Sequence, residues 1–231
     1  MGLGWDCARK LDLDASVLLL RRDGAHPLGL AVGGIAYFSN PRVAGVAHQG
    51  DHVRGRQKRK GGLTPAYMRP PSLDGSRGQL GVEDEEEPEE EDQEQVLLDL
   101  GAVAGDIAAI ALVVNVYSIN RSFDDVNEAY LRLSAGWPRA SAGPRALPGP
   151  DPHPEQSPKE LAYYGLDATG LANLSAGEAK TCNGLMLAAL LRGDGESRGW
   201  ELHALGHAAR GRTAAERGFQ AEVLSAVAGL V

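Results

Sequence analysis

Residues 11–17 read Leu-Asp-Leu-Asp-Ala-Ser-Val, and apolar and polar side chains alternate at every step. This alternation with a period of two is typical of a β-strand that is buried on one face only. The apolar run continues to Leu20, and a turn signal at residues 22–24 interrupts it. Because residues two apart in a strand share a face, Asp12 and Asp14 are predicted to lie together, with Leu13 facing the core on the other side.

Similar short strand patterns recur along the chain between turn signals, at residues 35–38, 96–100, 110–117, 129–133, 161–164 and 200–205. Residues 181–191 also fit a strand, although their leucine and alanine content would suit a helix. Near the C-terminal end, Phe219, Val223 and Val227 recur at helical spacing, so we expect a helix over residues 213–227. Many short strands and one closing helix predict an all-β fold, a β-sandwich with a short C-terminal helix.

Two compositionally biased stretches interrupt this pattern and are predicted to be long insertions into a single domain spanning residues 1–231. Residues 53–91 run from basic to acidic, and they offer too little apolar surface to offset the entropy of ordering, so we expect a disordered charged insertion. Residues 137–159 carry seven of the 13 prolines and are predicted to form a proline-rich linker loop. Ten acidic residues within 83–94 account for the net charge of -8, because the remaining 21 nearly balance the 23 basic ones.

The two cysteines, Cys7 and Cys182, cannot build a disulfide framework, and neither lies in a metal-binding CxxC spacing. Idle thiols suit a reducing compartment. The first apolar run, residues 17–20, is too short for a signal peptide. The longest apolar stretch, residues 107–116, is half the length that crosses a bilayer. We therefore expect a cytoplasmic protein with no membrane span.

Catalytic sequence motifs are not found. The chain has no GxSxG nucleophile elbow, no phosphate-binding P-loop and no GxGxxG fingerprint, and nothing ties either cysteine to a histidine base. The basic cluster at residues 54–60 lacks the interleaved aromatic residues on which nucleic-acid bases stack. We therefore expect a protein that is not an enzyme and does not bind nucleic acid.

The paired carboxylates of Asp12 and Asp14 are the first candidate for a chemical role. Two like charges on one strand face repel each other, and a bound cation would relieve the repulsion. Calcium is the natural candidate because it takes six to eight oxygen ligands from carboxylates and carbonyls. The alternative is that an alternating strand simply presents its polar side to water.

The run Gly-Leu-Gly-Trp-Asp at residues 2–6, followed by Asp-Leu-Asp-Ala-Ser at residues 12–16, resembles the opening signature of the tellurium-resistance TerD family. Later segments follow in the order that the family has: residues 48–51, 94–100, 113–117 and 199–206. The resemblance implies a β-sandwich that binds calcium through acidic loops and serves stress responses, including tellurite resistance. Some relatives are described as binding cAMP.

The resemblance also implies a calcium loop that starts at residues 50–51 and ends at residues 92–94. With the strand carboxylates, the implied metal ligands are Asp12, Asp14, Asp51, Asp92 and Glu94. This chain departs from the family pattern at several positions. His52 replaces the usual Asn, Gln93 replaces an acid, Ser118 replaces an Asp, and the long charged insertion replaces a compact loop. The family strand that precedes residue 2 is also missing, which predicts an exposed edge open to another chain.

The sequence and the resemblance lead to two hypotheses about function. The first is a calcium-binding, stress-response module that acts by binding rather than by catalysis. It requires the acidic groups near positions 12–14, 51 and 92–94 to meet at one rim of the sandwich. The alternative is a metal-free TerD-like scaffold whose charged loops recruit protein partners.

Overall fold

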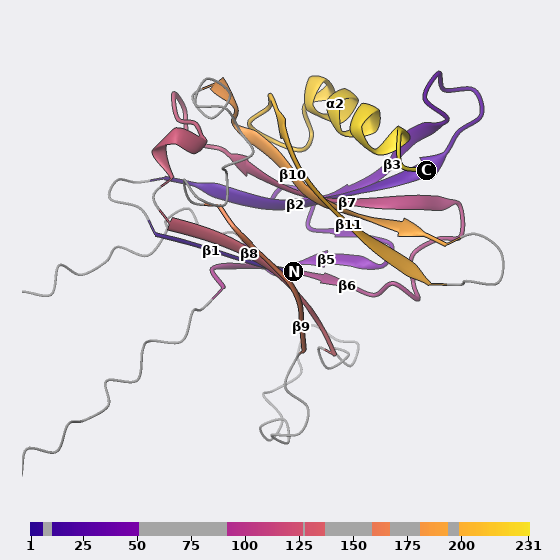
Figure 1. Ribbon diagram of the computed structural model, residues 1–231, viewed down its shortest axis with the longest axis horizontal. Helices are drawn as coiled ribbons and strands as arrows, with labels where there is room; N and C mark the ends of the chain where they lie inside the picture. Colours follow the sequence, from indigo (N-terminus) through magenta and orange to yellow (C-terminus); the bar gives the residue numbers. More distant parts are fainter. Residues whose placement is uncertain (7–10, 51–91, 127, 137–158, 167–180, 194–198) are drawn as a thin grey trace, which may run out of the picture.

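The computed structural model describes residues 1–6, 11–50, 92–126, 128–136, 159–166, 181–193 and 199–231 (Figure 1). The predicted insertion at residues 53–91 lies outside the described residues, as does the predicted linker loop except for Lys159, which begins a strand. Within the described part the chain forms two antiparallel sheets and one C-terminal helix, which confirms the predicted fold class.

The first sheet has six strands in the order β4-β5-β6-β1-β8-β9. Their bounds are β4 (Arg42–Val43), β5 (Val46–His48), β6 (Glu94–Leu98), β1 (Gly2–Asp6), β8 (Glu128–Ala135) and β9 (Lys159–Gly165). β1 is therefore a central strand, paired antiparallel to β6 on one side and to β8 on the other. The exposed edge that the missing first strand predicted does not arise along β1 itself. Instead, the chain begins in the middle of this sheet (Figure 1).

The second sheet has five strands in the order β11-β10-β7-β2-β3. Their bounds are β11 (Trp200–Ala209), β10 (Gly184–Arg192), β7 (Ile107–Val116), β2 (Leu13–Arg22) and β3 (Leu30–Ala36). The sequence of residues 181–191 suited a strand or a helix. Residues 184–191 belong to the strand β10, which pairs with β7 on one side and with β11 on the other. The apolar run at residues 107–116 is β7, and no described helix is long and apolar enough to cross a bilayer.

The core lies in two layers on the two faces of the second sheet. Leu13, Ala15 and Val17 of β2 belong to the cluster between the sheets, whereas Leu18 and Leu20 belong to the cluster beneath the helix. β2 is buried on both faces rather than one, because the helix α2 (Arg217–Ala228) lies over the outer face of this sheet (Figure 1). The helix contributes Phe219, Val223, Leu224 and Val227 to that layer, as its spacing predicted.

Candidate functional site

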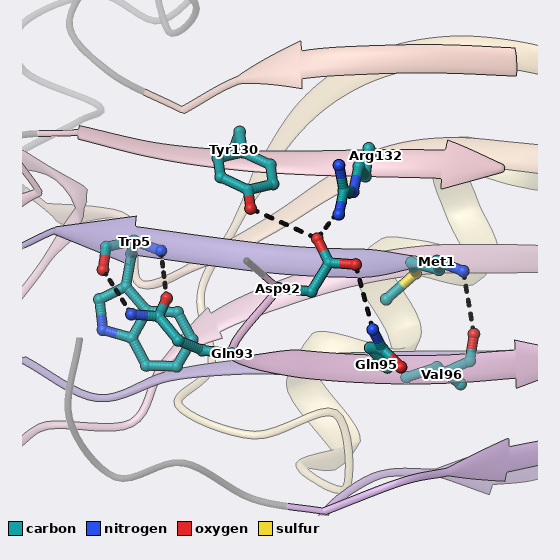
Figure 2. A network of polar contacts seen from close by, with 8 residues as sticks. All are labelled: Met1, Trp5, Asp92, Gln93, Gln95, Val96, Tyr130 and Arg132. Carbon is teal, nitrogen blue, oxygen red and sulfur yellow. Dashed lines mark hydrogen bonds and ion pairs between the residues drawn. The ribbon is translucent and has the colours of Figure 1, made fainter. Parts of the chain in front are cut away.

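Asp92, a predicted calcium ligand, lies on the outer face of the six-stranded sheet and joins the strands on both sides of β1 (Figure 2). Its Oδ1 forms an ion pair with Arg132 Nε at 2.8 Å and accepts a hydrogen bond from Tyr130 Oη at 3.4 Å, both on β8. Its Oδ2 accepts a hydrogen bond at 3.3 Å from Gln95 Nε2 on β6. The carboxylate therefore works as a structural cross-link between β6 and β8.

Two glycines of β1 leave room for this network. A Cβ on Gly2 would overlap the Asp92 carboxylate, and a Cβ on Gly4 would overlap the Tyr130 ring. Both positions face outward because Leu3 and Trp5, which alternate with them, belong to the core between the sheets. The Gly-Leu-Gly-Trp signature thus has a packing reason, since glycine in a strand marks a close approach by a neighbouring group.

Gln93 occupies a position where the resemblance implies an acid. Its Oε1 accepts a hydrogen bond from the Trp5 backbone N–H at 2.5 Å, and its Nε2 donates to the Trp5 carbonyl at 3.0 Å (Figure 2). An amide can supply one acceptor and one donor in this way, whereas an ionised carboxylate can only accept. The substitution therefore converts a would-be ligand position into a connection to β1.

Glu94 lies between the sheets, and its side chain is 0% exposed. Its Oε2 accepts a hydrogen bond from the Ala15 N–H of β2 at 2.8 Å and lies 3.5 Å from His48 Nε2 of β5. His48 Nδ1 accepts a hydrogen bond from the Gly50 N–H at 3.3 Å. The other ring nitrogen, Nε2, is therefore the one that lies beside the Glu94 carboxylate. Glu94 links strands of the two sheets, and the sequence alone did not indicate the role of His48.

Asp12 and Asp14 lie at the start of β2, near the end of β7. The Asp12 N–H donates to Ser118 Oγ at 3.0 Å, so the residue that replaces the family's Asp lies beside a predicted ligand. Asp14 is 3% exposed and is opposite Asn115 in the strand register. It points to the outer face of the five-stranded sheet, on the opposite side of β2 from the core face. The alternative that both carboxylates face water does not hold for Asp14.

We call Asp12, Asp14 and Glu94 the carboxylate rim, because the starts of β2 and β6 lie together at this end of the sandwich. Gly50, the last described residue before the charged insertion, lies at the same end. The rim carboxylates nevertheless point in different directions, and Asp92 faces the outer side of the other sheet. Asp51 lies outside the described residues. Within the described ranges, no group of three or more His, Cys, Asp or Glu side chains could hold a metal ion.

A groove opens at the other end of β1, around Met1, with a volume of about 940 Å³. We call it the β1 groove. Its polar wall includes Asp92, Arg132, Asp99 and Glu160. Its apolar lining comes from both sheets and includes Leu98, Leu133, Leu161, Leu190, Trp200 and Leu202.

Electrostatics at the groove depend on Asp92. Burial lowers the pKa of the Met1 α-amine to about 6, against the attraction of Asp92, and Arg132 lowers it further. Burial by itself would lower the pKa of Arg132, but its hydrogen bond and ion pair with Asp92, together with Tyr130 and Glu160, raise it. At neutral pH the α-amine is therefore mostly uncharged, and Arg132 stays cationic.

Comparisons with known proteins identify the fold. No family model matches the chain, and no curated protein matches it. Among solved structures, a protein of unknown function called SAV2460 aligns over 92% of this chain and 89% of its own, at 15% identity and a TM-score of 0.53. SCO6318 from Streptomyces coelicolor A3(2), described as a homologue of the telluride resistance protein TerD, aligns over 91% and 89%, at 14% identity and a TM-score of 0.53.

Proposed function

We propose that this chain, which has a TerD-like fold, acts by binding rather than by catalysis, as a metal-free TerD-like scaffold for interaction with other proteins. The observation that carries this proposal is the β1 groove, in which apolar side chains of both sheets remain accessible beneath a charged wall. Grooves with an apolar floor and a few polar groups are where proteins bind their ligands. In the same proposal, the charged insertion at residues 53–91 recruits further partners.

The contacts of the predicted ligand Asp92 and of its neighbour Gln93 support a metal-free protein. Asp92 is held by Arg132, Tyr130 and Gln95, and Gln93 bonds both backbone groups of Trp5. To coordinate calcium, Asp92 would have to give up its ion pair with Arg132. The Asp92 side chain is only 6% exposed in that pair. Removing one partner of a buried charge pair leaves the other uncompensated, which is strongly unfavourable.

The scaffold proposal is tested by capturing partners with the full chain and with a variant that lacks residues 54–90, each in calcium and in EDTA. We expect the full chain to retain specific partners equally in both buffers. Loss of those partners in the deletion variant would assign them to the charged insertion, and their retention would assign them to the sandwich. If neither protein retains a specific partner, or if capture requires calcium, the metal-free scaffold is wrong.

A second candidate is the calcium-binding, stress-response module of the cytoplasm that the family resemblance implies. One observation favours it: the starts of β2 and β6 and the end of β5 meet at the carboxylate rim. Asp12, Asp14 and Glu94 therefore lie at the end of the sandwich where Gly50, the residue before Asp51, also lies. If calcium binds only the folded protein, millimolar calcium raises the melting temperature, EDTA reverses the rise, and magnesium is weaker. An unchanged melting curve removes this candidate.

A further inference from the structure

An aromatic cluster lies where β3 and β7 end, on the two sides of the start of β2. Tyr37 and Phe38 follow β3, and Tyr117 follows β7. The rings of Tyr37 and Phe38 meet edge to face with their centroids 5.2 Å apart, and those of Phe38 and Tyr117 do the same at 5.2 Å. Aromatic pairs at this separation attract one another. The three rings therefore form one apolar surface that joins the ends of the two strands.

Ile119 lies two residues beyond Tyr117, at a turn where the next residue, Asn120, has the left-handed φ of 56°. The Ile119 residue is 71% exposed, and Tyr117 is 37% exposed. Large apolar side chains that are exposed singly are ordinary, whereas a group of them beside polar residues marks an interaction surface. None of these residues lines the β1 groove, so this surface is a separate one.

Arg212, in the segment between β11 and α2, places a cation beside the rings. Its guanidinium carbon lies 5.1 Å from the centroid of the Tyr117 ring. Its Nε and Nη2 both donate to the Tyr117 carbonyl, at 3.0 Å and 2.6 Å. A guanidinium has five N–H donors, so three remain, on the edge formed by Nη1 and Nη2. The side chain is therefore fixed in place and presents an edge that can bind a carboxylate through two parallel hydrogen bonds.

Two carboxylates close to Arg212 are engaged with other groups. Glu216 Oε1 accepts the backbone N–H of Arg212 at 2.9 Å, and Asp125 Oδ1 forms an ion pair with Arg121 Nη1 at 2.8 Å. Within the described ranges, no carboxylate forms an ion pair with the Arg212 guanidinium. A positive charge thus stands beside the apolar surface. Tyrosine and arginine are the residues in which the binding energy of protein interfaces is concentrated.

We call Tyr37, Phe38, Tyr117, Ile119 and Arg212 the Tyr117 patch. We propose that it is a docking surface for a segment of a partner protein in which an acidic residue adjoins apolar or aromatic residues. The acidic side chain binds the Nη1–Nη2 edge of Arg212, and its apolar neighbours cover the rings and Ile119. Charge complementarity selects an acidic segment over a basic one. This inference rests on the proposed function, because it adds a second binding surface to the scaffold.

The test uses the full chain and a fluorescent, end-blocked peptide of six residues, Gly-Glu-Leu-Phe-Leu-Gly, followed by anisotropy at physiological ionic strength. One control peptide has lysine in place of the glutamate, which reverses the charge that Arg212 would bind. A second control has serine in place of the two leucines and the phenylalanine, which removes the apolar contacts. We expect saturable binding of the probe and an affinity loss of at least about tenfold for each control peptide.

Two pairs of protein variants locate the binding. Ile119→Ser is expected to weaken probe binding about fivefold, whereas Leu28→Ser changes an apolar side chain that is 41% exposed outside the patch and should leave binding unchanged. Arg212→Gln is expected to weaken binding about tenfold, and Arg21→Gln removes the same charge near the opposite end of β2 without effect. Melting curves report on folding. If Arg212→Gln unfolds the protein, because Arg212 also bonds Tyr117, the Ile119 pair still decides.

Four results would overturn the inference: no saturable binding up to millimolar peptide, equal binding of the lysine peptide, equal effects of Ile119→Ser and Leu28→Ser, or binding of phosphatidylserine vesicles in place of the peptide, which would make the patch a lipid-binding surface. None of these removes the scaffold proposal, which fails only if partner capture fails or requires calcium. Conversely, failed capture with intact peptide binding would leave the patch established and the scaffold role wrong.

Discussion

The two ends of β1 differ in how the polar groups around the strand find partners. Near Trp5, Gln93 bonds the strand's own backbone, and Glu94 accepts the N–H of Ala15 from the opposite sheet. Near Met1, apolar side chains of β6, β8 and β9 and of the opposite sheet line the β1 groove. Glu94 of the carboxylate rim is thus held from within the chain, whereas the β1 groove presents apolar side chains of both sheets. Under the scaffold proposal, Glu94 therefore serves the fold, and partners bind at the β1 groove.

The largest expected effect comes from removing Glu94, which tests whether the carboxylate rim is structural. Glu94→Ala leaves the Ala15 N–H without its acceptor in a site closed to water and opens a cavity beside His48. We expect a loss of about 3 kcal/mol in the free energy of unfolding, measured by urea denaturation. Glu94→Gln keeps an oxygen acceptor and should lose less than half as much. Equal losses in the two variants would contradict the assigned role of the hydrogen bond.

A smaller effect is expected at Gly4, which tests the close packing on the outer face of β1. Gly4→Ala places a methyl group within the Tyr130 ring, which must move, at a cost of about 2 kcal/mol. Gly105→Ala is the matched control, since a Cβ there meets no atom within 4 Å. Thermal unfolding of both variants measures the difference. If the two substitutions have the same effect, the Gly-Leu-Gly-Trp signature has no packing reason at this position.

Gln93→Glu restores the acid that the family resemblance implies. The variant therefore tests whether the end of β1 near Trp5 is built for a metal ion or for the pairing of Gln93 with Trp5. The change removes the donor to the Trp5 carbonyl and directs a negative oxygen at it, so we expect a loss of about 1.5 kcal/mol in EDTA. Gln49→Glu is the control, because the exposed Gln49 also donates to a backbone carbonyl but water can replace it. A stability gain for Gln93→Glu in EDTA would contradict the pairing with Trp5.

The smallest effect is expected in the β1 groove itself. Leu161 lines the groove and is 53% exposed, so Leu161→Ser should change the free energy of unfolding by no more than about 0.5 kcal/mol. Urea denaturation measures it beside the Glu94 variants. A loss comparable to that of Glu94→Ala would mean that the groove belongs to the core, and the contrast between the two ends would disappear.

The sequence predicted the architecture because the alternation in β2 and the helical spacing in α2 are local patterns. It did not predict that β2 is buried on both faces, since that depends on where the distant helix packs. The same limit applies to the candidate ligands. Asp92 and Glu94 are two residues apart, but one reaches Arg132 on the outer face and the other reaches Ala15 between the sheets. Only the strand pairing determines those directions.

The β1 groove could not be predicted from any motif, because residues from separate strands line it. Leu98 comes from β6, Leu161 from β9 and Trp200 from β11. Only the pairing of the strands and the packing of the two sheets bring these side chains together.

Calorimetric titration of the full chain with calcium tests the central claim of a metal-free protein most directly. The account predicts no saturable binding up to millimolar calcium, because Arg132, Tyr130 and Gln95 hold the Asp92 carboxylate and the Glu94 carboxylate accepts the Ala15 N–H between the sheets. Saturable calcium binding that Glu94→Gln or Asp92→Asn abolishes would contradict the account.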